Sequence, residues 1–282
     1  MDKPLPTLAG PHTQFKRHPE RGTHERAAVH TIIDEASICH LSFVLDGQAV
    51  TLPTAHARID DRLYVHGAIR NRMLGTLAGA ARASATFTLI DGLVLARTAF
   101  HHSMNFRSAL VFGPIAEVVD REEKRAALHA LVEQIAPGRM SELDPPSDAE
   151  LQATFVLRLT IDEASAKQRQ GPPLDGADDL ARDVWAGEVP LALRATAPRR
   201  DPRLRSEQLI SAAANARADE PIVERWHGEQ LLSSDRSRLQ FDRIHRFLSA
   251  ESYWAKDVSR ARLATALDRS LCFGAYLHGV QV

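Results

Sequence analysis

The sequence predicts a mainly β fold with peripheral helices over its first two thirds, followed by a small α+β element. Short apolar runs flank the dipeptides Asp46-Gly47 and Asp91-Gly92, and this arrangement is a strong signal for antiparallel hairpins. Helical periodicity is confined to three stretches of this part, so the strand–helix alternation of a parallel sheet is poor. These two observations predict an antiparallel barrel or sandwich.

The first elements run from a polar arm to a hairpin. Residues 1–23 are polar and rich in proline and glycine, so we expect an extended arm. Residues 24–36 space their apolar side chains as an amphipathic helix does. Residues 38–55 form two β runs, and Pro53 in the second lacks the amide donor of a ladder, which marks an edge, bulge or strand end.

Further strands and two more helices are expected before residue 165. Asp120 and Glu123 resemble a capping box at the start of the last helix. In order, the predicted elements are a turn and strand at 58–67, a short helix at 68–81, two β runs at 84–96, a longer strand at 106–120 with a bend at Gly113-Pro114, a helix at 120–139 and a sixth strand at 153–164.

Composition bounds the function. The 282 residues suffice for about two domains, with 44% hydrophobic and 25% charged residues and a formal net charge of −1. That charge argues against nucleic acid and an anionic membrane as partners.

Because no apolar leader or membrane-length apolar run occurs, a cytoplasmic protein is expected. Cys39 and Cys272 are too few for a disulfide scaffold, and Cys39 is expected to be a small buried hydrophobe.

The strand around residues 103–112 carries polar residues that need an explanation. Alternation divides its side chains into a core-facing set, Met104, Phe106 and Leu110, and an opposite set, Ser103, Asn105 and Arg107. A bound anion or heteroaromatic ligand would explain the opposite set, and a solvent-facing side is the alternative. Ala109 and Val111 continue that face as apolar residues, which weakens the solvent alternative.

A second polar constellation follows the strand that ends at Gly67. A helix begins there with Arg70 and Arg72 in its first turns. Arginine offers a charge-assisted fork that suits phosphate, so the site suits a mononucleotide phosphate. Two ordinary surface arginines on a solvent-facing helix are the alternative.

Several other chemistries lack their motifs. Adjacent His101 and His102 point opposite ways in an extended chain, and no ligand spacing accompanies them, so no metal site is expected. Ligation of a heme by a single histidine stays open. The sequence contains no nucleophile elbow, P-loop or dinucleotide-binding glycine motif, and no side chain stands out as an acid or base.

With these stretches assembled, residues 21–193 resemble the pyridoxamine 5′-phosphate oxidase-like, FMN-binding split-barrel flavoproteins, and most of all the branch that includes the nitroimidazole-resistance proteins. Three blocks carry the resemblance, at 34–74, 89–113 and 163–187. It implies a six-stranded antiparallel split β-barrel at residues 24–193, a homodimer, and one FMN per subunit at the dimer interface.

The same resemblance implies cofactor-binding residues in four segments. The family often has serine where this chain has Ala68, so one phosphate hydroxyl is missing, for which Arg70 and Arg72 could compensate. The implied residues are Thr51, Leu52, Pro53 and Thr54 on the flavin-facing strand; His66, Gly67, Arg70, Asn71 and Arg72 at the phosphate turn; Asn105, Arg107 and Ser108 on the next segment; and Lys167 and Trp185, which reach the partner's flavin.

The end of the chain differs in character. Residues 194–221 hold six arginines, four acidic residues and three prolines without apolar periodicity, which is typical of a linker. Residues 222–282 resemble the start of a GNAT-type N-acetyltransferase, with its first strand, two helices and second strand. The pyrophosphate-loop motif for acetyl-CoA is absent, so a truncated fragment without acetyltransferase activity is expected.

The leading functional prediction is an FMN-dependent oxidoreductase. Reduced FMN would pass electrons to a small electron-poor acceptor such as a nitro-aromatic or a quinone, with NAD(P)H as electron donor. The alternatives are a non-catalytic flavin- or heme-binding sensor, a regulatory remnant of a fused acetyltransferase, or a degenerate fold without a ligand.

Overall fold

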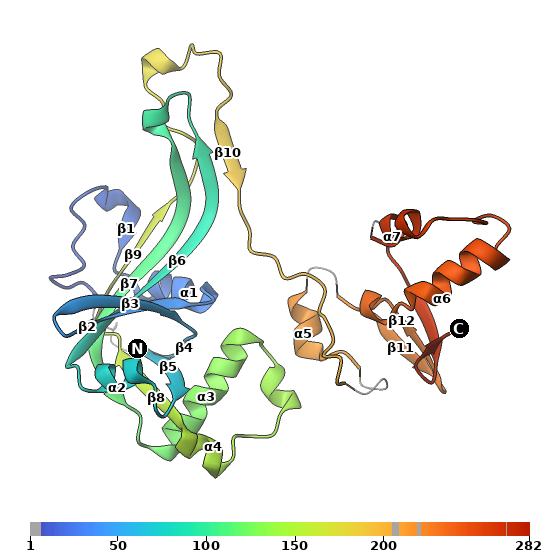
Figure 1. Ribbon diagram of the computed structural model, residues 1–282. Helices are drawn as coiled ribbons and strands as arrows, with labels where there is room; N and C mark the ends of the chain where they lie inside the picture. Colours follow the sequence, from blue (N-terminus) through green and yellow to red (C-terminus); the bar gives the residue numbers. More distant parts are fainter. Residues whose placement is uncertain (1–6, 205–208, 219–220, 269) are drawn as a thin grey trace, which may run out of the picture. The chain divides into compact units, whose positions relative to one another are not determined.

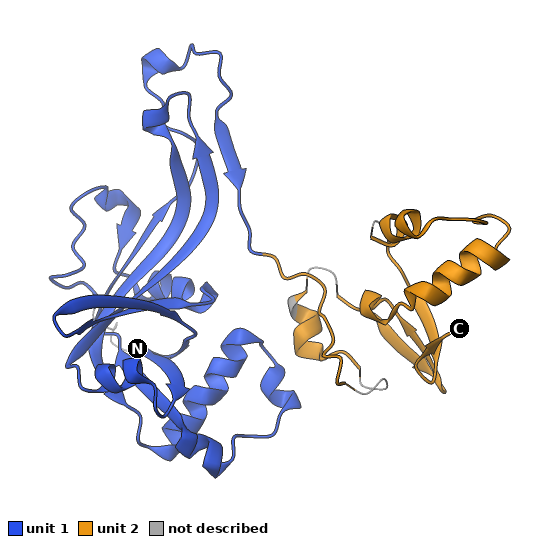
Figure 2. Cartoon of the chain, in the orientation of Figure 1, with its two compact units in different colours: residues 1–193 blue, residues 194–282 orange. Residues whose placement is uncertain are grey.

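The computed structural model describes residues 7–204, 209–218, 221–268 and 270–282. The chain forms two compact units, unit 1 at residues 1–193 and unit 2 at residues 194–282 (Figure 2). Residues 1–6 of the predicted arm, and residues 205–208 and 219–220 of the predicted linker, lie outside the described residues. Among the described residues, each helix is too short or too polar to span a lipid bilayer.

Unit 1 is mainly β with helices at its periphery (Figure 1). Its strands are β1 (Gly22–Thr23), β2 (Cys39–Leu45), β3 (Gln48–Thr54), β4 (Ala57–Ile59), β5 (Arg62–Ala68), β6 (Arg82–Leu95), β7 (Ser103–Glu117), β8 (Thr154–Thr160), β9 (Glu163–Arg169) and β10 (Gly187–Pro190). Its helices are α1 (Arg26–Glu35), α2 (Arg72–Ala78), α3 (Arg121–Ile135) and α4 (Asp148–Ala153), with short 3₁₀ turns η1 (Pro19–Arg21), η2 (Ala99–His101), η3 (Arg139–Glu142) and η4 (Ala177–Asp179).

The sheet of unit 1 is antiparallel and follows the order β3-β2-β6-β7-β8-β5-β4. The strand β9 pairs with β7, β1 pairs with β9, and β10 pairs with β6. The two ends of this path, β3 and β4, are consecutive in the chain and separated by Ala55 and His56. The sheet therefore curls back on itself and leaves a seam between its first and last strands, which confirms the predicted split barrel.

The bend predicted at Gly113-Pro114 is the corner at which β7 changes partner. Residues up to Phe112 pair with β9, whereas Ile115–Glu117 pair with β8. A Cβ atom at Gly113 would lie 1.6 Å from the carbonyl oxygen of Thr160. Only glycine fits there, because the backbone of a neighbouring strand occupies the place of any side chain.

The barrel core fills with apolar side chains from α1, α2 and the strands. Val29 and Ile33 on α1, Leu41 on β2 and Phe87 on β6 are completely buried. Cys39 is also completely buried, as predicted, and burial raises the pKa of its thiol to about 12. This side chain therefore acts as a packing group, since the reactive thiolate is absent near neutral pH.

Two predicted boundaries in unit 1 are wrong. Asp91-Gly92 is not a hairpin turn, because β6 runs through it with a bulge between Ile90 and Gly92, and both halves pair with β7. At Gly92 an added Cβ would lie 3.1 Å from the carbonyl oxygen of Val189, so this glycine serves the close approach of β10. The predicted sixth strand ends at Thr160, and a new strand, β9, starts at Glu163.

Unit 2 has a strand pair, helices and a second strand pair. The predicted single strand around residues 222–233 is a hairpin, because Gly228 adopts a positive φ of 59° between β11 and β12. The elements are α5 (Ala212–Arg217), β11 (Glu224–His227), β12 (Gln230–Ser233), the 3₁₀ turn η5 (Arg236–Arg238), α6 (Phe241–Arg246), the π-helical turn η6 (Phe247–Glu251), α7 (Arg260–Asp268), β13 (Gly274–Leu277) and β14 (Val280–Gln281). The four strands form one antiparallel sheet, and the acetyltransferase resemblance stays a prediction.

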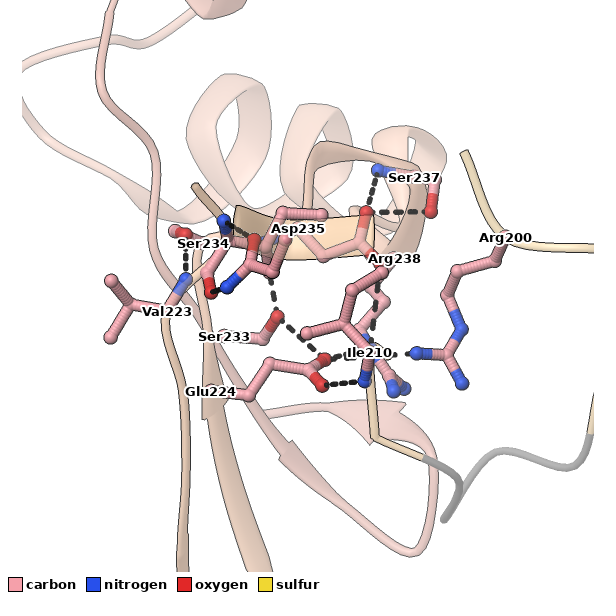
Figure 3. Close-up of polar contacts among 11 residues, drawn as sticks. Arg200, Ile210, Val223, Glu224, Ser233, Ser234, Asp235, Ser237 and Arg238 are labelled. Carbon is pink, nitrogen blue, oxygen red and sulfur yellow. Dashed lines mark hydrogen bonds and ion pairs between the residues drawn. The ribbon is translucent and has the colours of Figure 1, made fainter. Parts of the chain in front are cut away.

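A buried carboxylate joins the predicted linker to the sheet of unit 2 (Figure 3). Glu224, whose side chain is 3% exposed, accepts hydrogen bonds from the Ile210 amide at 2.9 Å and from Arg238 Nε at 2.8 Å. Ser233 donates to it at 3.1 Å, and Arg200 lies 3.8 Å away. Arg200 and Ile210, two residues of the predicted linker, therefore lie against the sheet of unit 2.

Candidate functional site

The predicted cofactor residues fall into two groups on different parts of unit 1. The seam group comprises Thr51–Thr54 on β3 and His66–Arg72 at the end of β5 and the start of α2. The arm group comprises Asn105, Arg107, Ser108, Lys167 and Trp185. Here β6 and β7 form a long hairpin that extends beyond the barrel, and β10 pairs with the end of β6 (Figure 1). We call this hairpin the arm.

On β3, the seam group offers exposed hydroxyl and apolar side chains. Thr51 is exposed, and its hydroxyl lies 2.8 Å from that of Ser42. Leu52 and Pro53 are also exposed. Pro53 lies on β3, the terminal strand of the sheet path, and pairs with His40 on the neighbouring strand β2. The missing amide donor of Pro53 is tolerated at such an edge, as predicted.

The turn after β5 carries the cations of the seam group. Arg70 and Arg72 are exposed, and within the described residues neither guanidinium has a hydrogen-bond or ion-pair partner. Asn71 caps α2, because its Oδ1 accepts a bond of 3.2 Å from the Leu74 amide. Partial desolvation lowers the pKa of His66, so its ring is neutral at pH 7.

The topology brings the two halves of the seam group to the same side of the barrel. In the β4–β5 register, Ala57 lies opposite Tyr64. Beyond this pair β5 continues to Ala68, while the chain before Ala57 turns back into β3. The ends of β3 and β5 therefore flank the same seam.

The face of β7 that carries Asn105 and Arg107 is the core face, so the predicted orientation of this strand is wrong. Ala109 and Val111 on that face are buried in the barrel core, whereas Met104 is 42% exposed. The polar residues are tolerated because they lie at the arm end of the strand, where other chain segments supply partners. The predicted alternation of side chains along β7 is correct, but alternation alone does not show which face of the strand lies in the barrel core.

Arg107 is bound by two carboxylates of unit 1. Its Nε and Nη2 donate to Asp91 at 3.0 and 2.8 Å, and its Nη1 and Nη2 donate to Glu35 at the end of α1. Hydrogen bonds to these carboxylates raise the pKa of Arg107 and lower that of Glu35. The positive charge of Arg107 is therefore already compensated inside the protein.

Asn105 is 6% exposed and joins three segments at the base of the arm. Its amide nitrogen donates to Glu188 on β10 at 2.5 Å, and its oxygen accepts from Arg169 at the end of β9. Arg169 also donates to the carbonyl oxygens of Gly171 and Pro172, each at 2.8 Å. Asn105 thus fixes the returning chain against β7.

The remaining predicted residues of the arm group lie close to Asn105 or farther along the arm. Ser108 pairs with Lys167, whose carbonyl oxygen accepts from the serine hydroxyl at 3.3 Å. The ammonium group of Lys167 donates to the carbonyl oxygen of Arg17 at 2.9 Å. Trp185 is 65% exposed and rests on Gly187, where an added Cβ would lie 2.9 Å from the indole ring.

Within one chain the two groups are well separated. Thr51 pairs with Ser42, which pairs with Ser84, which in turn pairs with Phe112. Phe112 lies about 13 Å along β7 from Ser108, and three strand spacings of about 4.8 Å separate β3 from β7. Thr51 and Ser108 are therefore on the order of 20 Å apart.

Two cations that sequence reasoning missed lie beside the arm group. Arg21 and Arg169 line adjoining cavities of about 490 and 240 Å³ between α1, β1, β9 and the loop after β9. Arg169 was not identified from the sequence because the predicted sixth strand ends at residue 164, before it. The signal that could have found it is its spacing of two from Lys167.

The histidine pair occupies the tip of the arm. His101 ends the turn η2, and Nδ1 of His102 lies 2.8 Å from the carbonyl oxygen of Thr98 in the same turn. In the portion of the chain that the structure describes, no group of three or more metal-ligating side chains is found.

Two solved structures are similar to most of this chain. No curated protein sequence matches it. The flavocytochrome Anf3 from Azotobacter vinelandii shares 32% identity at a TM-score of 0.69, over 74% of this chain and 97% of that one. An FAD and heme binding protein from Mycobacterium smegmatis shares 32% identity at a TM-score of 0.67, over 70% and 97% of the two chains.

A 5-nitroimidazole antibiotic resistance protein from Bacteroides thetaiotaomicron shares 23% identity at a TM-score of 0.45, over 52% of this chain and 85% of that one. The family model of pyridoxamine 5′-phosphate oxidase matches residues 25–168, which is about half of the chain and most of unit 1. The predicted family is thereby confirmed, and the chain belongs to the pyridoxamine 5′-phosphate oxidase family.

Proposed function

We propose that unit 1 binds a flavin at the seam and passes electrons from it to a small electron-poor acceptor. Two relatives at 32% identity support a flavin, since one is named a flavocytochrome and the other an FAD and heme binding protein. The observation that carries the location is the pair Arg70 and Arg72, which are exposed beside the seam and have no acidic partner in the described chain.

The residues at the seam fit the parts of a flavin. Arginine suits phosphate because its planar fork donates two parallel hydrogen bonds, so Arg70 and Arg72 hold the diphosphate of FAD or the terminal phosphate of FMN. Leu52 and Ile69, which are 39% and 48% exposed, offer apolar contact to a ring system. The neutral ring of His66 and the hydroxyl of Thr54 supply hydrogen bonds.

The kind of flavin is part of the proposal. The family resemblance implies FMN, whereas the relative from Mycobacterium smegmatis is named for FAD and shares 32% identity over 70% of this chain. We therefore favour FAD over FMN. Mass spectrometry of the flavin released from the purified protein distinguishes the two molecules.

A heme is a second candidate, because a heme is named for one relative and a cytochrome for the other. The cavities beside the arm do not fit it. Their described lining contains no histidine, cysteine, methionine or tyrosine, the residues that usually bind a heme iron axially. A Soret band in the visible spectrum of the purified protein would establish a heme.

A bound flavin supplies the hydride or single-electron transfer. The chain itself anchors the phosphate through Arg70 and Arg72 and shields the ring from water through Leu52 and Ile69. No carboxylate of the described chain contacts these arginines, so they carry full positive charge toward the ligand. The proposed acceptors are nitro-aromatics and quinones, which need no side-chain acid of their own to accept an electron.

The test compares flavin content in matched variants. The double variant Arg70→Ala, Arg72→Ala is expected to lose at least about nine tenths of its flavin, because two charge-assisted phosphate contacts disappear. Arg82→Ala is the control, since Arg82 is a half-exposed arginine bound to Asp162. Equal flavin content in both variants would place the phosphate elsewhere.

Turnover and assembly are measured on the same protein. Reduction by NAD(P)H followed by reoxidation with a nitroimidazole or a quinone is expected, and a flavin that no acceptor reoxidises would contradict the oxidoreductase proposal. The predicted homodimer is proposed as the assembly that completes the seam. Light scattering is expected to give a mass near twice that of the 31.1 kDa chain.

A further inference from the structure

The arm has an apolar side that is open to solvent. On that side Val189 of β10 pairs with Leu93 of β6, which pairs with Met104 of β7. The next row toward the barrel pairs Ile90 with Phe106. Because paired residues on neighbouring strands point to the same side of a sheet, these five apolar side chains form one patch. We call this patch the arm face.

The arm face is turned away from the core of its own chain. Met104, Ile90 and Val189 are 42%, 41% and 38% exposed. Along β7, Ala109 and Val111 point to the opposite side, where they are buried in the same core as the apolar side chains of α1. The packed side and the exposed apolar side of the arm are therefore different sides of the same strands.

The size of the arm face is that of a contact surface. Its exposed fractions leave on the order of 300 Å² of apolar area, a size at which patches on monomers are often functional. One partner of a standard interface contributes roughly 450 Å² of apolar area, so the arm face supplies most of that amount. Small hairpins are only marginally stable in water, so a partner would also stabilise the arm.

The charge of the arm face indicates the kind of partner. Its five members are uncharged, and the same side continues toward the barrel with Thr88 opposite Ser108 and Thr86 opposite Leu110. Contacts between different proteins are commonly selected by complementary charge, which this side of β6 and β7 does not offer. In a two-fold dimer the same patch lies on both subunits, so a neutral apolar patch meets its copy without repulsion.

The same side of the sheet leads from the arm face to the seam. Ser84 lies on this side of β6 and pairs with Ser42 of β2, which pairs with Thr51 of β3. Thr51 belongs to the seam group, so no change of side separates the arm face from the proposed flavin site. A second copy that spreads over this side therefore approaches the seam, as the assembly that completes the seam must.

We infer that the arm face is the contact surface for a second copy of this chain, and that the two arms hold the homodimer together. Each arm face is buried against the same neutral side of the other subunit's sheet. The inference rests on the homodimer of the proposed function and adds the surface that forms it.

Analytical ultracentrifugation of the full chain over a dilution series tests this surface. The double variant Met104→Thr, Val189→Thr removes apolar area and keeps residues that suit strands. We expect the dissociation constant of its dimer to rise at least about tenfold, because two apolar side chains lose their buried contact. The control is Val119→Thr, Leu143→Thr, which changes two apolar residues outside the arm that are 83% and 41% exposed. This control is expected to dissociate as the wild-type chain does.

Two results would overturn the inference. One is a dissociation constant that is the same for the arm variant and its control, and the other is a wild-type chain that is monomeric at every concentration. Circular dichroism checks that the arm variant is folded. Should it not fold, Ile90→Thr on the same face takes its place, with an expected rise in the dissociation constant of at least about threefold.

Flavin absorbance of the same samples separates this inference from the proposed function. A wild-type chain that holds flavin, with a dimer that the arm variant does not weaken, would contradict the arm face alone. A wild-type chain without flavin, with a dimer that the arm variant does weaken, would support the arm face and contradict the proposed flavin site alone.

Discussion

Arg107 and Asp91 face each other from β7 and the bulge of β6, joined by hydrogen bonds of 3.0 and 2.8 Å between guanidinium and carboxylate. Glu35 binds the same guanidinium from the end of α1. One side chain thereby ties the first helix to the base of the arm. Arg107, which the sequence suggested as a cofactor ligand, thus forms ion pairs within its own chain.

We expect Arg107→Ala to act on stability before it acts on cofactor binding. The substitution leaves Asp91 and Glu35 facing each other without a cation, and should lower the free energy of unfolding by about 1–3 kcal/mol. Thermal unfolding measures the change. Arg82→Ala, which removes the exposed pair with Asp162, is the control at about 0–1 kcal/mol. An Arg107→Ala chain as stable as wild type that loses its flavin would restore Arg107 as a ligand.

Two glycines of unit 1 should respond oppositely to alanine. Gly113→Ala places a Cβ 1.6 Å from the Thr160 carbonyl oxygen, so β7 must move, with an expected loss above about 3 kcal/mol or failure to fold. Gly75→Ala, within α2, meets nothing within 4 Å and should stabilise by about 0.5–1 kcal/mol. Denaturant midpoints decide, and a tolerated Gly113→Ala would mean that the corner is placed wrongly.

The buried His56 should make stability depend on pH. Its ring is 1% exposed, Nε2 lies 2.9 Å from the Ile33 carbonyl oxygen, and Nδ1 is buried without a partner. Burial lowers the pKa of His56 below its ordinary value, so the folded state keeps the ring neutral while the unfolded chain takes up a proton. Stability is therefore full above about pH 6.5 and falls as the pH drops below it, by at most about 1.4 kcal/mol per pH unit.

The variant His56→Phe should flatten this slope, whereas His102→Gln at the exposed arm tip should not. Denaturant unfolding at pH 7.5, 6.5 and 5.5 measures the three proteins. A wild-type midpoint that does not change between pH 7.5 and 5.5 would show that the ring is protonated in place.

Glu224 should hold the segment around Ile210 on unit 2. The isosteric change Glu224→Gln leaves Arg238, whose side chain is 9% exposed, without the carboxylate that accepts from its Nε, at an expected cost of about 3 kcal/mol. It also weakens the acceptor of the Ile210 amide. Hydrogen exchange in residues 209–218 is therefore expected to accelerate, while Glu229→Gln, at an exposed pair with His278, leaves it unchanged. Equal exchange rates in both variants would refute the role of Glu224.

The sequence predicted the local elements well where the signal is short-ranged. The hairpin at Asp46-Gly47, the buried Cys39 and the edge position of Pro53 follow from turn chemistry and apolar alternation. Asp120 caps α3 by accepting from the Glu123 amide at 2.7 Å, as its capping-box spacing predicted. Each of these features is decided within a few residues of the chain.

Features that depend on distant chain segments escaped the sequence. Asp91-Gly92 has the composition of a hairpin turn, yet both flanking runs pair with the same strand and β10 packs on Gly92. Alternation along β7 predicted that its larger apolar side chains face the core. In the structure the other face of β7 is the core face, and Asn105 and Arg107 are tolerated there because carboxylates bind them, namely those of Glu188, Asp91 and Glu35. The buried position of Arg169 could not be predicted from the sequence, because its partners lie on another strand and in a loop.

By itself, the sequence determined the helices and most strands and turns of the β-rich barrel, because turn propensities and apolar periodicity act between neighbouring residues. The family followed from the resemblance of whole stretches of the sequence. The tertiary structure alone decided which polar residues are compensated and which are available to a ligand. Arg107 is bound to two carboxylates, whereas Arg70 and Arg72 are bound to none, so the distinction is electrostatic. Coulomb interactions depend on distance in space, which spacing along the chain does not reveal.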